Sequence, residues 1–212
     1  MKISGLFITS SGTEIGKTFV AAKMCRVFFD SGKTVTAVKP VISGFDEADF
    51  LYSDSAVLLQ SADKEPTLEN IKEITPFRFG AALSPDMAAR REGRSINFGE
   101  LVDYSRGVLA GPEDHKLIEG IGGVMVPLTD EHTVLDWIAA LDIPAVVVVG
   151  SYLGTISHTL TAVAALETNG VEIAEVVISE SPDSPVDLQE TVDVLQNFLP
   201  RRKLRLLPWE EA

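Results

Sequence analysis

The residues with the most specific chemical meaning lie near the N-terminus, in the segment 9–18 with the sequence TSSGTEIGKT. A short apolar run precedes this segment and a helical pattern follows it, which is the context of a phosphate-binding loop. The N–H groups of such a loop and of the helix after it converge on phosphate oxygens. We expect Lys17 to reach the β- and γ-phosphates of a nucleotide and the Thr18 hydroxyl to bind Mg²⁺.

One feature of this loop departs from the usual pattern. A glycine normally opens the loop where this chain has Ser11, and the upstream glycine is Gly12. The alternative is an incidental Gly-Lys-Thr turn between a strand and a helix. Because the strand, loop and helix patterns all fall in register, the sequence favours the phosphate loop.

Charged residues stand at the ends of two further apolar runs. Lys39 follows the run 34–38, and Glu119 ends the run 116–119. The carboxyl ends of parallel strands meet at one edge of a sheet, where ligands bind. We therefore expect Lys39 to point toward the phosphate site and Glu119 to take the place of a metal-binding acid. A solvated edge lysine and an exposed glutamate in a tight turn are the alternatives.

Two other places could bind a ligand but have ordinary explanations. The loop 150–155 follows the apolar run 145–149 and opens another helix, whose N-terminus could bind a carboxylate or phosphate. Simple capping by Thr155 or Ser157 explains the same pattern. Asp54 stands at an expected helix start, where acids usually interact with the helix dipole.

Short apolar runs alternate with helical patterns along the chain, which favours a parallel sheet. We expect strands at 6–9, 34–38, 116–119, 145–149, 174–178 and 204–207. We expect helices at 16–29, from Asn97, at 133–141, at 156–167 and from Ser184-Pro185. The prediction is an α/β fold of P-loop NTPase type, a mostly parallel β-sheet flanked by helices on both faces.

The segment 45–94 is less regular than the rest of the chain. It contains at least two expected helices, near 53–61 and 84–91, and we interpret it as an irregular helical insertion over the carboxyl edge of the sheet. We expect residues 1–212 to form a single domain that includes this insertion.

Composition excludes several classes of protein. Asp and Glu number 31 against 18 Lys and Arg, a net charge of −13 that disfavours nucleic acid and anionic membranes as partners. The one cysteine, Cys25, allows no internal disulfide and no cysteine-based metal cluster. The apolar runs are too short to span a membrane, and the N-terminus does not match a secretory signal. We expect a cytoplasmic protein.

Several segments in a fixed order resemble one enzyme family. They are 12–18 (GTEIGKT), 39–44 (KPVISG), Asp54, 84–85 (SP), 119–123 (EGIGG), 148–150 (VVG), 153–158 (LGTISH) and 208–209 (PW). Together they resemble the dethiobiotin synthetases, and the resemblance extends from about Leu6 to Trp209. Three such motifs in this order are more specific than a phosphate loop alone.

The resemblance implies an ATP-dependent ring closure in biotin biosynthesis. In this reaction 7,8-diaminononanoate takes up CO2 as a carbamate, ATP phosphorylates the carbamate, and the second amine closes the ring. The products are dethiobiotin, ADP and phosphate. The resemblance also implies Mg²⁺ as cofactor, ATP as co-substrate and a homodimer.

The resemblance further assigns roles to residues. The catalytic residues are Lys17 and Lys39, which hold the γ-phosphate and carbamate oxygens, and the Mg²⁺ ligands are Thr18, Asp54 and Glu119. The nucleotide-binding set is Thr13, Glu14, Ile15, Gly16, Lys17, Thr18, Phe19, Glu119, Gly120, Ile121, Gly122, Ser179, Pro208, Trp209 and Glu210. The substrate-binding set is Thr13, Lys39, Ser43, Gly123, Gly150, Leu153, Gly154 and Thr155.

Some positions differ from the family pattern. Asp86 stands where the family often has a histidine after Ser-Pro, and Ser179 stands where an asparagine usually reads adenine. The alternative function is a regulatory ATPase of the MinD/ParA type. Those proteins carry a signature lysine near the start of the phosphate loop, where this chain has Ser11, so the sequence favours the synthetase.

Overall fold

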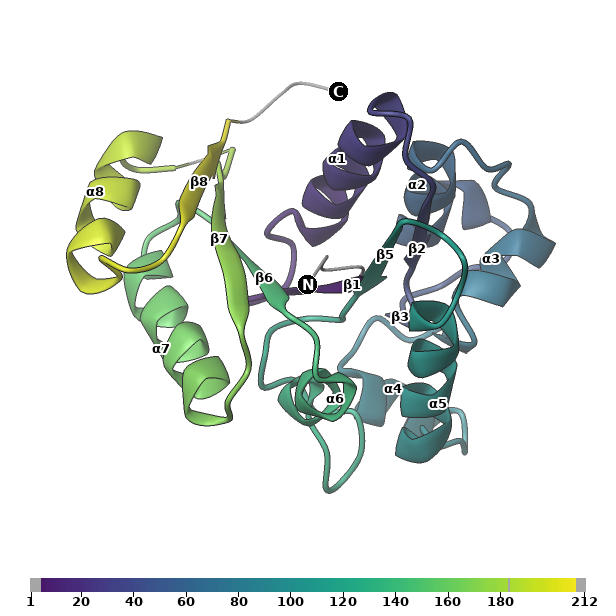
Figure 1. Cartoon of the computed structure of the whole chain (residues 1–212). Helices are drawn as coiled ribbons and strands as arrows, with labels where there is room; N and C mark the ends of the chain where they lie inside the picture. Colours follow the sequence, from purple (N-terminus) through teal and green to yellow (C-terminus); the bar gives the residue numbers. More distant parts are fainter. Residues whose placement is uncertain (1–4, 183, 209–212) are drawn as a thin grey trace.

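The computed structural model describes residues 5–182 and 184–208, and its centre is a six-stranded sheet in which every neighbouring pair of strands is parallel (Figure 1). The order of the strands is β2-β5-β1-β6-β7-β8. Their bounds are β1 Gly5–Ser10, β2 Val35–Val38, β5 His115–Glu119, β6 Ala145–Val149, β7 Ile173–Ser179 and β8 Leu204–Leu207. All six expected strands are confirmed, and every residue of β6 is buried, as in a strand covered on both faces.

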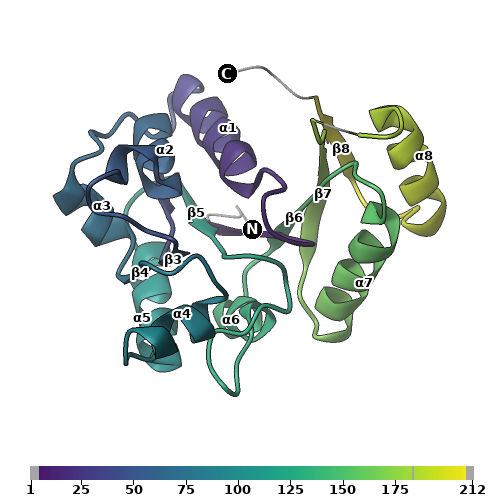
Figure 2. The same cartoon turned by 180° about the vertical axis from the view of Figure 1, so that it is seen from behind.

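Helices cover both faces of this sheet (Figure 2). On one face lies α1 (Lys17–Asp30), with α2 (Asp54–Ser61) packed beside it. On the opposite face lie α5 (Phe98–Leu109), α6 (Val134–Leu141), α7 (Thr155–Thr168) and α8 (Leu188–Phe198). The expected architecture, a parallel sheet between two layers of helices, is therefore confirmed.

The segment 45–94 and the residues just before it contain the two helices placed from the sequence and several short elements besides. The two expected helices are present as α2 and α4 (Pro85–Arg91), and the segment also holds η1 (Phe50–Tyr52) and α3 (Leu68–Ile74). In addition, β3 (Val41–Ser43) pairs in parallel with β4 (Phe77–Phe79) to form a small second sheet. Strands of three residues are too short to show an alternating pattern, which explains why the sequence did not reveal them.

Two helix starts differ from expectation. Helix α8 begins at Leu188 and not at Ser184-Pro185, because the Asp187 carboxylate accepts a hydrogen bond from the Gln189 N–H at 2.7 Å and caps the helix there. Helix α7 is not capped by Thr155 or Ser157: its N-cap is Gly154, without a side-chain cap. The Thr155 hydroxyl donates instead to the Gly150 carbonyl, at 2.7 Å.

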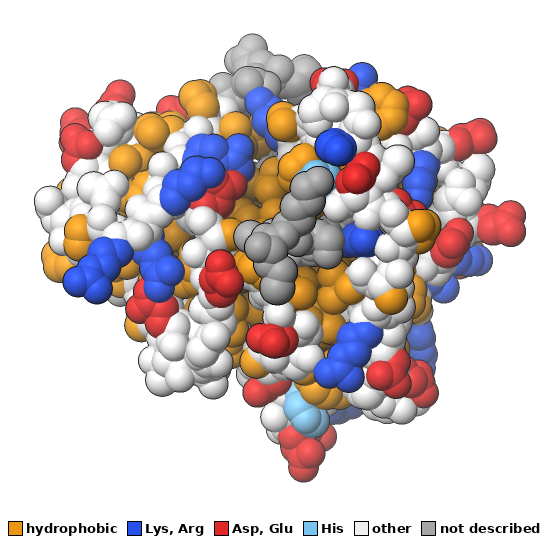
Figure 3. All heavy atoms as spheres, viewed as in Figure 1, with side chains coloured by type: hydrophobic (Ala, Val, Ile, Leu, Met, Phe, Trp, Pro, Cys, Tyr) orange, Lys and Arg blue, Asp and Glu red, His pale blue; other side chains and the backbone are white. Residues whose placement is uncertain are grey.

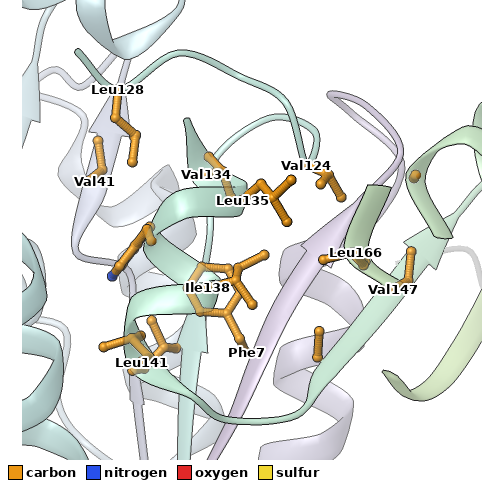
Figure 4. Packing of buried hydrophobic residues seen from close by; sticks show 14 of the residues in the cluster. Phe7, Val41, Val124, Leu128, Val134, Leu135, Ile138, Leu141, Val147 and Leu166 are labelled. Carbon is orange, nitrogen blue, oxygen red and sulfur yellow. The ribbon is translucent and has the colours of Figure 1, made fainter. Parts of the chain in front are cut away.

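The larger hydrophobic core lies between the sheet and α5 to α8, and Trp137 of α6 is at its centre. The edge of one ring faces the other in the Phe7–Trp137 pair, with centroids 4.8 Å apart. The indole N–H of Trp137 donates to the Ser105 hydroxyl of α5 at 3.0 Å. Figure 4 shows Ile138 and Leu141 of α6 gathered with Phe7 of β1. This core holds α6 against the strand that leads into the phosphate loop.

Charges of both signs are spread over the surface. On the face shown in Figure 3, acidic and basic side chains are interspersed around a central area of hydrophobic side chains. Among the described helices, none combines the length and apolar character needed to cross a bilayer.

The packing of Trp137 gives a test of the core. Replacing Trp137 with alanine removes a fully buried ring and leaves Ser105 without its indole donor. The free energy of unfolding should fall by about 3–5 kcal/mol in urea denaturation. The control is Val27→Ala, at an α1 side chain that is 65% exposed, which should change stability by less than about 0.5 kcal/mol. Equal effects of the two substitutions would contradict this assignment of the core.

Candidate functional site

The turn into α1 requires a glycine at position 16. Gly16 is the N-cap of α1 with a φ of 84°, in the left-handed region that favours glycine. A Cβ on Gly16 would also lie 2.9 Å from the Ser179 Oγ at the end of β7. No side chain caps α1, so its first N–H groups stay available to an anion.

Lys17 lies inside the loop that precedes it. Its Nζ is buried and donates to the Ser10 Oγ at 3.1 Å and to the Gly12 carbonyl at 3.2 Å. Burial, helped by the nearby ammonium of Lys39, lowers the pKa of Lys17 to about 8. The side chain is thus held close to the loop, and it loses its charge as the pH rises through about 8.

Lys39 is held between two carboxylates. Its Nζ lies 2.5 Å from the Glu119 Oε1 and 2.8 Å from the Asp54 Oδ2. Lys39 and Glu119 are both buried, while the Asp54 side chain is 45% exposed. Burial alone would lower the pKa of Lys39, but the two carboxylates outweigh it and the pKa is raised. Lys39 is therefore a protonated ammonium throughout the physiological range.

A third oxygen ligand adjoins these acids. The Thr18 hydroxyl donates to the Glu119 Oε1 at 2.8 Å, and Asp54 lines the same cavity beside it. The second carboxylate oxygen of Glu119, Oε2, is buried without a hydrogen-bond partner. An orphaned carboxylate oxygen beside a hydroxyl and a second carboxylate suits a hard cation such as Mg²⁺. Within the described residues, no cluster of three or more His, Cys, Asp or Glu side chains could hold a metal.

Most of the expected site residues line one cavity of about 320 Å³ at the carboxyl edge of the sheet. The cavity brings together residues from the phosphate loop, from the segment after β2, from the start of α2 and from the end of β5. Twelve expected residues line it: Thr13, Glu14, Ile15, Gly16, Lys17, Thr18, Lys39, Ser43, Asp54, Glu119, Ile121 and Gly122. Their proximity is a product of the strand order, since β2, β5 and β1 are neighbours.

A second groove, of about 410 Å³, adjoins the first at Thr13, which lines both. Its walls are the phosphate loop at residues 11–13, the segment 123–126 and the first turns of α7. Apolar side chains predominate along the wall formed by Val124, Met125 and Val126. This groove could receive a hydrocarbon chain that extends from the first cavity.

The other expected residues lie around these two spaces. The Gly120 carbonyl accepts from Lys39 at 3.4 Å, and Gly123 lies against the backbone of Ser11. Ser179 lies where a Cβ on Gly16 would meet it, and a Cβ on Gly150 would lie 2.9 Å from Ile15.

Five expected residues stand further from the cavity. Leu153, at the start of α7, is 88% exposed, and Gly154 and Thr155 follow it in the same turn. Phe19 stands on α1 with the Lys23 Nζ 4.9 Å from its ring centroid, and it does not line the cavity. Pro208 follows β8 at the surface, whereas Trp209 and Glu210 lie outside the described residues.

The sequence did not identify two residues that the structure places at the site. Ile42 lines the cavity beside Ser43, and Ser10 accepts a hydrogen bond from Lys17. Ile42 has no chemical group that marks it, so only the path of the chain identifies it. Ser10 ends β1 next to the loop, and that position could have indicated a role.

A larger cavity, of about 650 Å³, lies at the outer edge of β2, between α2, α3 and α5. Its charged lining consists of Lys64 with Glu65, Glu73 and Glu113. Three acids against one lysine disfavour a phosphate ligand, so the smaller cavity is the better candidate for nucleotide chemistry.

Comparisons with known proteins agree on one family. Residues 4–212 match the family described as "AAA domain". An ATP-dependent dethiobiotin synthetase from Acidiphilium cryptum is 47% identical over 93% of this chain and 89% of its own length. Another, from Methylobacterium nodulans, is 44% identical over 91% of this chain and 88% of its own length.

Solved structures with the same fold include the cell division ATPase MinD of Pyrococcus furiosus. It superimposes with a TM-score of 0.58 and covers 98% of this chain and 84% of its own, at 15% sequence identity. A likeness at that level of identity shows the fold alone.

The pKa of Lys17 predicts how anion binding depends on pH. Above pH 8 the free enzyme loses the Lys17 charge, so a bound phosphate loses one ionic partner. The affinity for ADP without divalent metal should be constant between pH 6.8 and 7.5 and then fall, by up to about tenfold per pH unit above pH 8. Isothermal titration calorimetry measures this. Lys17→Met should bind ADP more weakly at pH 7 and show a flat profile above pH 8; a falling profile in that variant would assign the titration to another group.

Proposed function

Because this chain belongs to the family of ATP-dependent dethiobiotin synthetases, we propose that it catalyses the carboxylation and ring closure of 7,8-diaminononanoate with CO2 and ATP. The products are dethiobiotin, ADP and phosphate. The observation that carries the proposal is the placement of Lys17 and Lys39 in one cavity with the phosphate loop, Asp54 and Glu119.

The reaction needs two anions to approach each other. A carbamate and the γ-phosphate of ATP repel, and a water-poor site strengthens this repulsion. Lys17, Lys39 and the N-terminus of α1 direct positive charge into the same cavity and stabilise both anions as they meet. The buried lysines cannot reorient freely, so this stabilisation is already in place before the reaction begins.

The chemistry then proceeds in two bond exchanges. A carbamate oxygen attacks the γ-phosphorus, and the bond to the β-phosphate oxygen breaks to release ADP. The second amine attacks the carbonyl carbon of the mixed anhydride, the bond from that carbon to the phosphate oxygen breaks so that phosphate leaves, and the amine nitrogen loses a proton to solvent. No side chain forms a covalent bond to the substrate, so the enzyme contributes positioning and charge stabilisation.

The charges of the cavity favour Mg²⁺ as the cofactor. Lys17 and Lys39 face three carboxylates, those of Glu14, Asp54 and Glu119. These side chains alone give no net positive charge with which to hold a triphosphate. We propose that Thr18, Asp54 and Glu119 hold the ion, which supplies positive charge to the nucleotide phosphates.

The apolar groove beside Thr13 supports a place for the hydrocarbon chain of the diamine. The residues Gly150, Leu153 and Gly154 belong to the loop before α7 and Thr155 is the first residue of the helix, whose N-terminus has no side-chain cap and suits the carboxylate at the end of that chain. Leu153 is exposed, as is Met125 on the wall of the groove. We propose that a second copy of the chain covers this surface in a homodimer, that residues 1–212 act as one domain, and that the enzyme works in the cytoplasm.

The activity can be tested directly. Purified protein with ATP and Mg²⁺ should release ADP when both 7,8-diaminononanoate and bicarbonate are present, with dethiobiotin formed in equal amount by mass spectrometry. Omitting either the diamine or bicarbonate is the control. ADP release that is indifferent to the diamine would instead favour a regulatory ATPase.

Lys39 should be essential in this assay. Lys39→Gln removes one preorganised charge from the reacting anions, and turnover should fall by about 10²-fold or more. Circular dichroism and the melting temperature report whether the variant is folded. A folded Lys39→Gln enzyme with near-normal turnover would remove Lys39 from the reaction.

The two acids should control the requirement for metal. Glu119→Gln and Asp54→Asn each keep the shape of the side chain and remove one negative charge. Both variants should need a higher Mg²⁺ concentration for half-maximal activity, and the increase should be larger for Glu119 because it is the more buried of the two. Activity is titrated with Mg²⁺ at constant ATP. Curves that overlay that of the unmodified enzyme would mean that the acids only support the structure.

A further inference from the structure

Ser151 follows Gly150 just after the end of β6, and its N–H, its Oγ and its carbonyl all make hydrogen bonds. Its N–H donates to the Ser181 Oγ at 3.1 Å, and its own Oγ accepts from the Ser181 N–H at 2.9 Å. Its carbonyl accepts from the Ser184 Oγ at 2.9 Å. Ser151 is 1% exposed. The loop after β6 is therefore joined to the loop after β7 by a reciprocal pair of hydrogen bonds and a third bond beside it.

Close packing on the other side of Gly150 completes this attachment. A Cβ on Gly150 would lie 2.8 Å from the Ser181 Oγ and 2.9 Å from the Ile15 side chain of the phosphate loop. The Gly150 carbonyl also accepts from the Thr155 hydroxyl. Three segments thus meet at residues 150 and 151: the phosphate loop, the loop after β7 and the first turn of α7.

The other hydrogen bonds of the loop beyond this point are local: the Thr155 N–H donates to the Tyr152 carbonyl at 3.1 Å, and the Tyr152 hydroxyl hydrogen-bonds to the His158 Nδ1 at 2.9 Å. Gly154 has a φ of 99°, no side chain caps α7, and Leu153 is exposed to solvent. A segment with few buried contacts opens locally at low cost in free energy. Helix α7 itself is held by its packing in the core, and the hydrogen bonds of Ser151 add the polar link between the loop 150–155 and the loop after β7.

We propose that Ser151 and Ser181 are positioning residues that hold the loop 150–155 in place for the tail of the diamine. This inference rests on the proposed function, in which that loop binds the substrate carboxylate. The two serines need not touch the substrate. They fix the distance between the site of the tail and the site of phosphoryl transfer, a distance that a substrate of fixed length must span.

Neither serine is marked by the motifs of the chain. Ser151 lies between Gly150 and Leu153, and Ser181 comes two residues after Ser179, which lies where a Cβ on Gly16 would meet it. The hydrogen bonds of Ser181 therefore connect the tail loop to the same strand end that adjoins the phosphate loop. A substitution at Ser181 should therefore weaken binding of the substrate tail more than binding of the triphosphate, because Lys17 and the α1 N-terminus bind the triphosphate directly.

The experiment uses the variants Ser151→Ala, Ser181→Ala and the double variant in the full-length enzyme. Each single variant should raise the KM for the diamine about fivefold, the effect of losing about one ordinary hydrogen bond. The KM for ATP and kcat should stay within about twofold. The double variant should raise the diamine KM further than either single variant, because each single substitution removes only one of the two hydrogen bonds of the reciprocal pair. Ser181→Thr keeps the hydroxyl and should restore the diamine KM.

The matched control is Ser31→Ala, which removes a serine hydroxyl that donates to a backbone carbonyl at 2.7 Å at the C-terminal end of α1, far from this loop. It should leave both KM values unchanged. If the serine variants have lower melting temperatures but an unchanged KM for the diamine, the serines are structural and the inference is wrong. An equal rise in both KM values would also overturn it.

Hydrogen exchange separates this inference from the proposed function. The amide of Ser151 should be protected in the unmodified protein, and amides 151–155 should exchange faster in Ser181→Ala. If the unmodified enzyme does not turn over the diamine, the proposed function fails and the assignment of a substrate tail fails with it. The exchange data would then still decide whether the serines restrain the loop: unchanged protection in Ser181→Ala would overturn that as well.

Discussion

A buried ammonium must be surrounded by negative charge. Lys39 is such a buried ammonium, and this requirement explains why two carboxylates lie beside it in the cavity. With its Nζ between Glu119 and Asp54, the lysine stays charged inside the protein. Replacing a buried ion pair with packed apolar residues is often neutral or stabilising, so stability alone does not explain a lysine here. The cost of burying it is consistent with a catalytic role, since the same charge is what two reacting anions need.

The sheet supplies the geometry that this cluster requires. Strand β2 leads to Lys39, β5 ends at Glu119, and β1 leads into the loop with Lys17; these three strands are neighbours in the order β2-β5-β1. Asp54 comes from outside the sheet, at the first residue of α2, and α2 packs against α1. A shift of α2 along α1 would therefore move one of the two carboxylates away from Lys39, which couples the packing of these helices to the electrostatics of the cavity.

The overall charge of the protein and the charge needed at the site have opposite signs. A net charge of −13 repels ATP at a distance, so affinity must come from short-range donors. The turn at Gly16 and the uncapped start of α1 provide such donors, and a divalent ion between Thr18, Asp54 and Glu119 would add more positive charge. Salt screens the repulsion at long range but has little effect on buried contacts, so the site does not depend on a positive surface.

The sequence by itself determined the fold class, all six strands of the main sheet and most residues of the cavity. Those features depend on local patterns: a fully apolar run for β6, a glycine before Lys17, and an acid or a lysine directly after a strand. Only the tertiary structure decided which atoms of these groups pair with each other. The ion pairs of Lys39 join residues 80 and 15 positions apart in the chain, and Ser151 bonds to Ser181 and Ser184 across 30 and 33 positions. Such contacts depend on strand order and on how neighbouring loops pack, and a pattern within one segment contains no information about either.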